Sequence, residues 1–316
     1  MRHLALALLV VLAIARVATA HDLRPGVLTL RELPDGDYAL RLVPPIDSRG
    51  DARELAVELP PGCARDGARV HCDRALAGRL AVRGLRGPMK LIVVVERAGS
   101  RDEWVVDAGA PSIDVATTAP AGVVAWIRLG IAHILAGYDH LAFVLGLLLV
   151  LEVRASRRLF AAITAFTVAH SITLALAVLG VLSVRAAPVE ACIALSVLLV
   201  AREALHDQPT AIRRMPWLAA GAFGLVHGLG FASALRALGV SGGSLARSLV
   251  AFNVGVELGQ LAVIGVALAV VAAGRRLIGE RRILGRGIHR TACYALGALA
   301  AWWLLQRVLE LGGGAR

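Results

Sequence analysis

Six ionisable residues stand inside apolar segments, where such side chains are costly. They are His133, Asp139, His140, His170, His227 and Glu257. A charged side chain at the centre of a bilayer costs about 2.5–3.5 kcal/mol on insertion scales, so these residues usually face a bundle interior and mark a site or pathway. Neutral imidazole and carboxylate are good ligands for zinc, nickel and cobalt. We therefore expect the six residues to form one divalent metal site.

The segment 133–140 carries three of these residues within two helical turns. In a continuous helix His133 and His140 are separated by about 700°, so they share one stripe, with Asp139 about 100° to one side. Gly137 lies on the same stripe and leaves space between the histidines. The alternative is that Asp139 only orients a neighbouring histidine or caps a kink.

Two further histidines lie on separate apolar segments. His170 is flanked by hydroxyl residues, so an interhelical hydrogen bond is the alternative to a ligand role. His227 lies within a G-x-x-x-G pair formed by Gly224 and Gly228. Such a pair allows helices to approach closely. We expect this packing to bring His227 near another helix.

A polar stripe runs along the apolar segment that contains Glu257. Asn253, Glu257 and Gln260 follow one another at i, i+4 and i+7, and Gly255 and Gly259 form a second small-residue pair. This stripe needs an interior partner, so we include Asn253 and Gln260 as accessory residues of the site.

The composition places the chain in a membrane. Its 316 residues are 57% hydrophobic and have a mean hydropathy of +0.70, which is too apolar for an ordinary soluble domain. The net charge of +11 is carried by arginines in short runs between apolar segments, and membrane topology explains this pattern better than nucleic-acid binding does. We expect a lipid bilayer as partner and no nucleic acid.

Residues 1–20 have the layout of a cleavable signal peptide, with an uncleaved anchor helix as the alternative. Cleavage would leave His21 at the N-terminus, where its amine and imidazole can bind a metal or where it simply starts the first strand. Export implies an oxidising compartment, so Cys63 and Cys72 can form a disulfide bond.

Residues 21–118 differ from the rest because charged residues and Pro/Gly turns occur throughout. Four runs read as strands, at 27–30, 38–42, 80–82 and 91–95. We predict a small all-β, sandwich-like domain outside the cytoplasm, followed by a linker at 119–122.

The segment 123–316 reads as an α-helical membrane domain of about six spans, each close to the ~20 residues that a bilayer requires. The apolar segments are 123–150, 159–182, 188–205, 217–236, 248–273 and 291–309. With the β domain outside, twelve arginines fall in inner loops and three in outer loops. This predicts a bacterial inner-membrane protein with both the β domain and the C-terminus in the periplasm.

Three residues near the ends of the predicted spans have expected roles. Glu190 would lie at a periplasmic entrance, or simply at the solvated interface. Trp126 and Trp217 would be interfacial anchors.

Four motifs together resemble the HupE/UreJ hydrogenase and urease accessory membrane proteins, and in particular the longer branch with an N-terminal periplasmic domain. The motifs are His133-x-x-x-Gly137-x-Asp139-His140, Phe166-Thr167-x-Ala169-His170-Ser171, Phe223-Gly224-Leu225-x-His227-Gly228-x-Gly230-Phe231 and Phe252-Asn253-x-Gly255-x-Glu257-x-Gly259-Gln260. The resemblance implies a nickel or cobalt permease-like role, with the His-and-Asp motif as the metal contact. Ile134 departs from the family pattern, because shorter members often have proline there.

Three functions fit these residues. The first is a permease that passes a divalent ion through the His/Asp/Glu cluster; the sequence has no Walker motif for ATP hydrolysis. The second is an intramembrane metal-dependent hydrolase, in which Ser171 beside His170 assists a metal-activated water. The third is a membrane scaffold whose β domain binds a periplasmic protein. We expect a permease rather than an enzyme.

Overall fold

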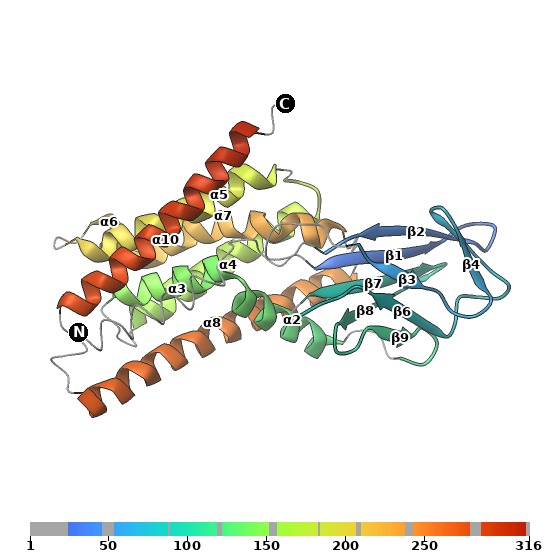
Figure 1. The fold of residues 1–316 in the computed structure, drawn as a ribbon, viewed down its shortest axis with the longest axis horizontal. Helices are drawn as coiled ribbons and strands as arrows, with labels where there is room; N and C mark the ends of the chain where they lie inside the picture. The colour runs from blue at the N-terminus through green and yellow to red at the C-terminus, as the bar shows by residue number, and fades with distance from the viewer. Residues whose placement is uncertain are drawn as a thin grey trace.

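The structure is a computed structural model that combines an N-terminal β region with a helical region (Figure 1). It describes residues 25–45, 54–87, 89–118, 122–151, 157–182, 184–206, 210–237, 243–278 and 286–313. The predicted signal peptide at 1–20, His21 and the linker residues 119–121 lie outside the described residues.

In the part of the β region that the structure describes, nine strands form two sheets. The larger sheet has the order β4-β5-β2-β1-β7-β8 and the smaller one the order β3-β6-β9. The strands are β1 (Gly26–Glu32), β2 (Tyr38–Val43), β3 (Ala56–Glu58), β4 (Cys63–Asp66), β5 (Arg69–Cys72), β6 (Arg79–Arg83), β7 (Lys90–Arg97), β8 (Ser100–Asp107) and β9 (Ser112–Asp114). Among these strands, β1 and β7 pair in parallel and the other pairs are antiparallel; the four predicted strands are confirmed as β1, β2, β6 and β7.

Both sheets contribute to one hydrophobic core. Leu28 and Leu30 of β1 and Val93 of β7 pack with Leu80 and Val82 of β6, so alternate side chains of each strand face inwards. The result is a sandwich-like arrangement. At the far edge of the larger sheet, Cys63 and Cys72 face each other across the β4–β5 hairpin and form a disulfide bond.

Eight helices follow within the described residues. They are α2 (Val123–Ala136), α3 (Tyr138–Val150), α4 (Arg157–Val178), α5 (Ala186–Leu205), α6 (Ala211–Arg214), α7 (Pro216–Ala237), α8 (Gly243–Ile278) and α10 (Arg286–Gly313). By length and apolarity, α4, α8 and α10 can each cross a membrane, and the bent pair α2–α3 can count as a fourth span. The predicted six apolar segments all coincide with helices, but six spans are not confirmed.

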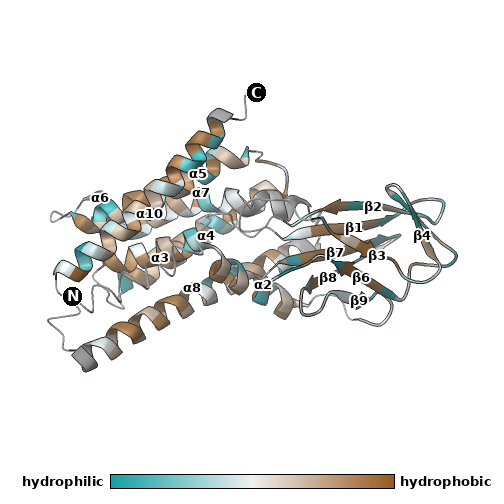
Figure 2. Ribbon diagram, in the orientation of Figure 1, coloured by the Kyte–Doolittle hydropathy of each residue, from teal (hydrophilic) through white to brown (hydrophobic). Residues whose placement is uncertain are grey.

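The outward-facing side chains of the helices are those of a membrane protein. Within the described ranges, every large apolar residue that is exposed lies in the helical region, and Val168, Val250 and Val266 are 53%, 65% and 65% exposed. The helices are accordingly hydrophobic along most of their length (Figure 2). Exposed valine and leucine on several helices match contact with lipid.

The outer face of the larger sheet packs on one end of the helices. Val27, Ile92 and Val94 alternate with the sandwich core residues and pack in one apolar cluster with Trp126 of α2 and Phe252 of α8. The expectation that Trp126 anchors at a membrane interface is therefore wrong, because the sheet and helices bury it to 3% exposure. The other predicted anchor, Trp217, is 52% exposed.

Candidate metal site

The first predicted span is not a continuous helix. It breaks between α2 and α3 with a bend of 73°. At the break Gly137 has an extended backbone, and its N–H donates to the His133 carbonyl oxygen at 2.9 Å. A Cβ at this position would lie 2.7 Å from Nδ1 of His140, so only glycine fits without displacing that ring. The prediction of one helical stripe through His133 and His140 is therefore wrong.

The break nevertheless places four imidazoles together. His133 in the last turn of α2 and His140 in the first turn of α3 have ring centroids 4.8 Å apart. The ring of His140 also lies 5.9 Å from that of His170 on α4 and 5.2 Å from that of His227 on α7. All four rings are buried, with at most 6% exposure, and His140 is central to the cluster.

Asp139 holds the ring of His140 in place. Its Oδ1 accepts a hydrogen bond from the His140 backbone N–H at 2.7 Å and lies 2.9 Å from Nδ1 of the ring. A carboxylate only accepts, so Nδ1 carries the proton and Nε2 carries the lone pair. Histidines that bind metals are commonly oriented by a carboxylate in this way. The orienting role weighed for Asp139 is thus present in the structure.

The donors of the cluster fit a divalent ion. Asp139, His140 and His227 each offer one ligand atom, and these atoms lie within 4.8 Å of one another. Two ligands of one ion are at most about 4.2 Å apart, so a small contraction would complete the coordination. Within the described residues, neither nitrogen of His170 has a hydrogen-bond partner, nor does Nδ1 of His227. Unpartnered buried polar atoms are costly, and an ion would satisfy them.

Close helix packing positions the histidines of α4 and α7. A Cβ at Gly224 would clash with the carbonyl oxygen of Phe166, and one at Gly228 would clash with the carbonyl oxygen of His170. The close approach predicted from this G-x-x-x-G pair is confirmed. It brings the backbone of α7 against α4 on either side of His227.

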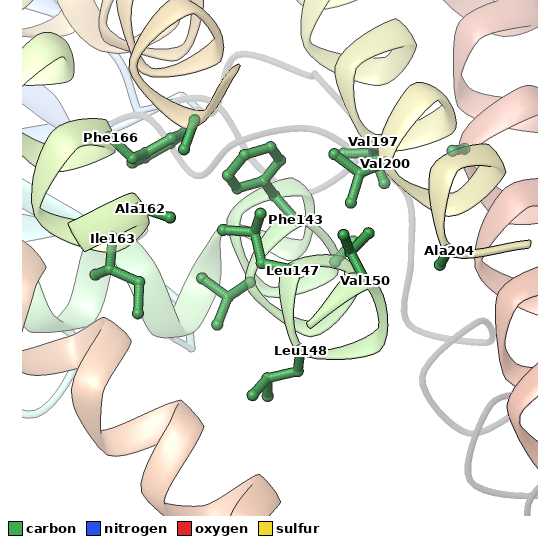
Figure 3. Packing of buried hydrophobic residues seen from close by; sticks show 14 of the residues in the cluster. Phe143, Leu147, Leu148, Val150, Ala162, Ile163, Phe166, Val197, Val200 and Ala204 are labelled. Atoms are coloured by element: carbon green, nitrogen blue, oxygen red, sulfur yellow. The ribbon is translucent and has the colours of Figure 1, made fainter. Parts of the chain in front are cut away.

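Apolar clusters lie on both sides of the imidazoles. The rings of Phe143 and Phe166 are 5.4 Å and 5.1 Å from that of His227 and belong to the helical core shown in Figure 3. On the other side, the ring of Phe252 lies 5.5 Å from that of His133 and belongs to the cluster that meets the β sheet. Aromatic side chains therefore border the imidazoles at His227 and at His133, while the side chain of Asp139 stays 17% exposed.

Two residues of the polar stripe of α8 hydrogen-bond to α4, Gln260 in a buried contact and Glu257 in an exposed one. Glu257 Oε1 accepts a hydrogen bond from Thr164 at 2.8 Å, and Gln260 Oε1 accepts one from Thr167 at 3.0 Å. Asn253 donates to a carbonyl of its own helix at 2.8 Å. The structure does not place Glu257 in the three-residue ligand group.

Glu190 forms an ion pair near the end of α10. Its Oε2 lies 3.2 Å from Nε of Arg307, a side chain that is 5% exposed. Arg307 also contacts Glu310, whose side chain is 50% exposed, at 3.2 Å. Glu190 thus links α5 to α10 instead of joining the histidines.

We expect Arg307→Leu to lower the free energy of unfolding by about 1–3 kcal/mol, because it removes the buried partner of the Glu190 carboxylate, whose side chain is 22% exposed. Glu310→Gln should cost under about 1 kcal/mol, since it removes only a half-exposed contact. Unfolding by SDS titration in mixed micelles measures both. Equal small losses would contradict the buried pair.

Sequence reasoning missed Ser196 of α5. Its Oγ lies 2.9 Å from Nε2 of His227, and the residue is 1% exposed. A single serine in an apolar helix gives no pattern that would reveal this contact. By contrast, Ser171 donates to the carbonyl of Thr167 at 2.6 Å, and no hydrogen bond to His170 is found in the described part of the chain.

Comparison with known protein families matches residues 111–307 to the family described as HupE/UreJ protein. Comparisons with curated proteins and with solved structures gave no significant match. The matched range starts after β8 and contains the four clustered histidines, Asp139 and nearly all of the helical region. The family indicates a metal transport or accessory role, in agreement with a buried His/Asp cluster. More than half of the chain is matched, and the protein belongs to the HupE/UreJ family.

Proposed function

We propose that the protein is a membrane permease that binds a divalent transition metal ion at the His/Asp cluster and passes it across the bilayer. The observation that carries this proposal is the group formed by Asp139, His140 and His227, whose ligand atoms lie within 4.8 Å of one another inside the helical region. His133 and His170 adjoin the group and provide further ligands as the ion moves.

The arrangement suits an ion that must later leave. The four histidines come from four different helices, α2, α3, α4 and α7, so a relative movement of the helices changes the number of ligands. Apolar residues beside the imidazoles, such as Phe166 and Phe252, shield much of the site from water. Alternating access would open such a site to one side of the membrane at a time.

The donor set favours a borderline divalent ion. Imidazole nitrogens and one carboxylate suit nickel, cobalt and zinc, while the ligand group contains no thiolate that would select a softer ion. Membership in the HupE/UreJ family supports nickel or cobalt among these.

The proposed topology has six spans in a bacterial inner membrane. The arginine asymmetry supports it, with the β domain of 21–118 and the C-terminus on the periplasmic side. The disulfide of the β region fits an oxidising compartment, which a signal peptide at 1–20 would provide. The β domain would then meet the ion, or a periplasmic protein, before the helices do.

Metal content and uptake test the proposal. Purified wild type should contain a divalent ion by mass spectrometry and should take up that ion in proteoliposomes, whereas His140→Ala should do neither because it removes the central imidazole. His289→Gln is the matched control, since His289 contacts the carbonyl of Leu149 on α3, outside the cluster. Bound metal without uptake would overturn the permease in favour of a metal-dependent hydrolase. Absence of metal from all three samples would contradict both the permease and the hydrolase and would favour a membrane scaffold.

A further inference from the structure

Ser196 connects a fifth helix to the candidate metal site. It lies on α5, faces the ring of His227 on α7 and is fully buried. Its Oγ is 2.9 Å from Nε2 of His227 and 2.7 Å from the carbonyl oxygen of Ile193, one turn earlier on the same helix. The hydroxyl therefore has two partners within hydrogen-bond distance.

The two contacts determine where the proton of His227 lies. A serine hydroxyl has one proton, and the carbonyl of Ile193 can only accept it. The oxygen of Ser196 is then free to accept a hydrogen bond from Nε2–H of His227. The opposite arrangement would put the imidazole proton on Nδ1, which has no acceptor among the residues that the structure describes. A buried N–H without an acceptor is strongly unfavourable, so the first arrangement prevails.

We infer that Ser196 is a positioning residue that holds neutral His227 in the Nε2–H tautomer and so presents the Nδ1 lone pair to the metal ion. The inference rests on the proposed function for its consequence, namely metal affinity. The tautomer itself follows from the protein contacts and exists whether or not an ion is bound.

The neighbouring histidine has the opposite tautomer. Asp139 accepts the proton of Nδ1 of His140, so that ring presents Nε2. The two histidines of the ligand group thus offer different nitrogens, each selected by a different kind of acceptor. Helix α5 takes part in the site through Ser196 although it contributes no ligand.

Ser196→Ala tests the inference. It removes the acceptor of Nε2–H, so NMR of isotope-labelled histidine rings should show that the His227 signal, assigned by its loss in His227→Gln, no longer reports a single Nε2–H tautomer. The affinity for nickel should fall about 10–100-fold, as is typical when a group that orients a metal ligand is lost. Ser196→Thr keeps the hydroxyl and should restore both the tautomer and most of the affinity.

Ser171→Ala is the matched control. Ser171 follows His170 on α4 and bonds to a carbonyl of its own helix, as Ser196 does, but among the described residues it has no hydrogen bond to an imidazole. It should leave the tautomer and the nickel affinity unchanged. A wild-type tautomer in Ser196→Ala, or an equal loss of affinity in the Ser171 variant, would overturn the inference. If wild type binds no nickel, the proposed function fails, and the tautomer measured in the metal-free protein still decides the role of Ser196.

Discussion

Asp139→Asn is expected to weaken nickel binding by about 100-fold while the protein stays folded. The amide oxygen of asparagine can still accept the hydrogen bonds from the backbone and ring of His140, so the geometry is preserved. What is lost is the negative charge, and Asp139 is the only acidic residue in the ligand group. A divalent ion held by neutral imidazoles in a buried site depends strongly on such a charge.

Glu257→Gln is the control for this experiment. Glu257 is also a carboxylate inside an apolar helix, but it accepts a hydrogen bond from Thr164 and lies outside the ligand group. Isothermal titration in detergent should show little change in nickel affinity for this variant. An equal loss of nickel affinity in both variants would show that Glu257 also binds the ion. An unchanged affinity in Asp139→Asn would show that Asp139 is not a ligand.

The sequence predicts the members of the cluster better than their arrangement. Ionisable residues stand out in apolar segments because burying them is costly, and this alone selected His133, His140, His170 and His227. Their closeness is shown by the ring distances, which range from 4.8 Å to 6.0 Å for the pairs in contact. The same criterion also selects Asp139 and Glu257, and the polar stripe on the helix of Glu257 indicates only that this side chain needs a partner. The stripe shows which face of the helix is polar, but it does not show which residue of another helix Glu257 contacts. In the structure that residue is Thr164.

Helical periodicity could not predict the bend at Gly137. Glycine also occurs inside membrane helices, so its presence does not by itself indicate a break. The reason for glycine appears only in three dimensions, where a side chain at 137 would meet Nδ1 of His140 at 2.7 Å and Oδ1 of Asp139 at 3.2 Å. The assumption of a straight helix was wrong, but it still predicted that His133 and His140 are neighbours. They are neighbours because the bend brings their rings to 4.8 Å.

In the β region, too, the sequence predicts the strongly hydrophobic strands but not how the strands pair. The runs that became β1 and β7 are rich in aliphatic residues and were predicted, whereas β8 was missed because it begins with charged residues. Those charges are matched across the pair: Arg101 contacts Glu96 at 2.5 Å and Asp102 contacts Arg97 at 3.2 Å. Cross-strand ion pairs of this kind depend on register, which a single strand does not reveal.

Gly130→Ala is expected to lower the free energy of unfolding by about 3 kcal/mol. Gly130 of α2 faces α8, and a Cβ there would clash with the carbonyl oxygen of Phe252 and lie 2.9 Å from the backbone nitrogen of Val256. These are backbone atoms, which cannot turn aside as a side chain can. The contact is reciprocal, because Gly255 of α8 lies against the carbonyl oxygen of Ile127. The two helices must therefore separate to admit even one methyl group.

Gly265→Ala separates this steric effect from the general effect of replacing a helical glycine. Gly265 lies on the same helix α8, and a Cβ at this position would meet no neighbouring atom within 4 Å among the described residues. Alanine should therefore be neutral there or stabilising by up to about 1 kcal/mol. SDS titration in mixed micelles would compare the two variants with wild type. Equal stability of Gly130→Ala and Gly265→Ala would contradict the close contact between α2 and α8.

The same pair of variants connects packing to metal binding. The rings of Phe252 and His133 are 5.5 Å apart. Separation of α2 from α8 would move Phe252 away from His133 and so weaken the packing around the histidine cluster. Nickel affinity should then fall together with stability in Gly130→Ala and stay at the wild-type level in Gly265→Ala. A destabilised Gly130→Ala that binds nickel normally would mean that the ligand group depends on α3, α4 and α7 alone, with His133 and the α2–α8 contact serving only the fold.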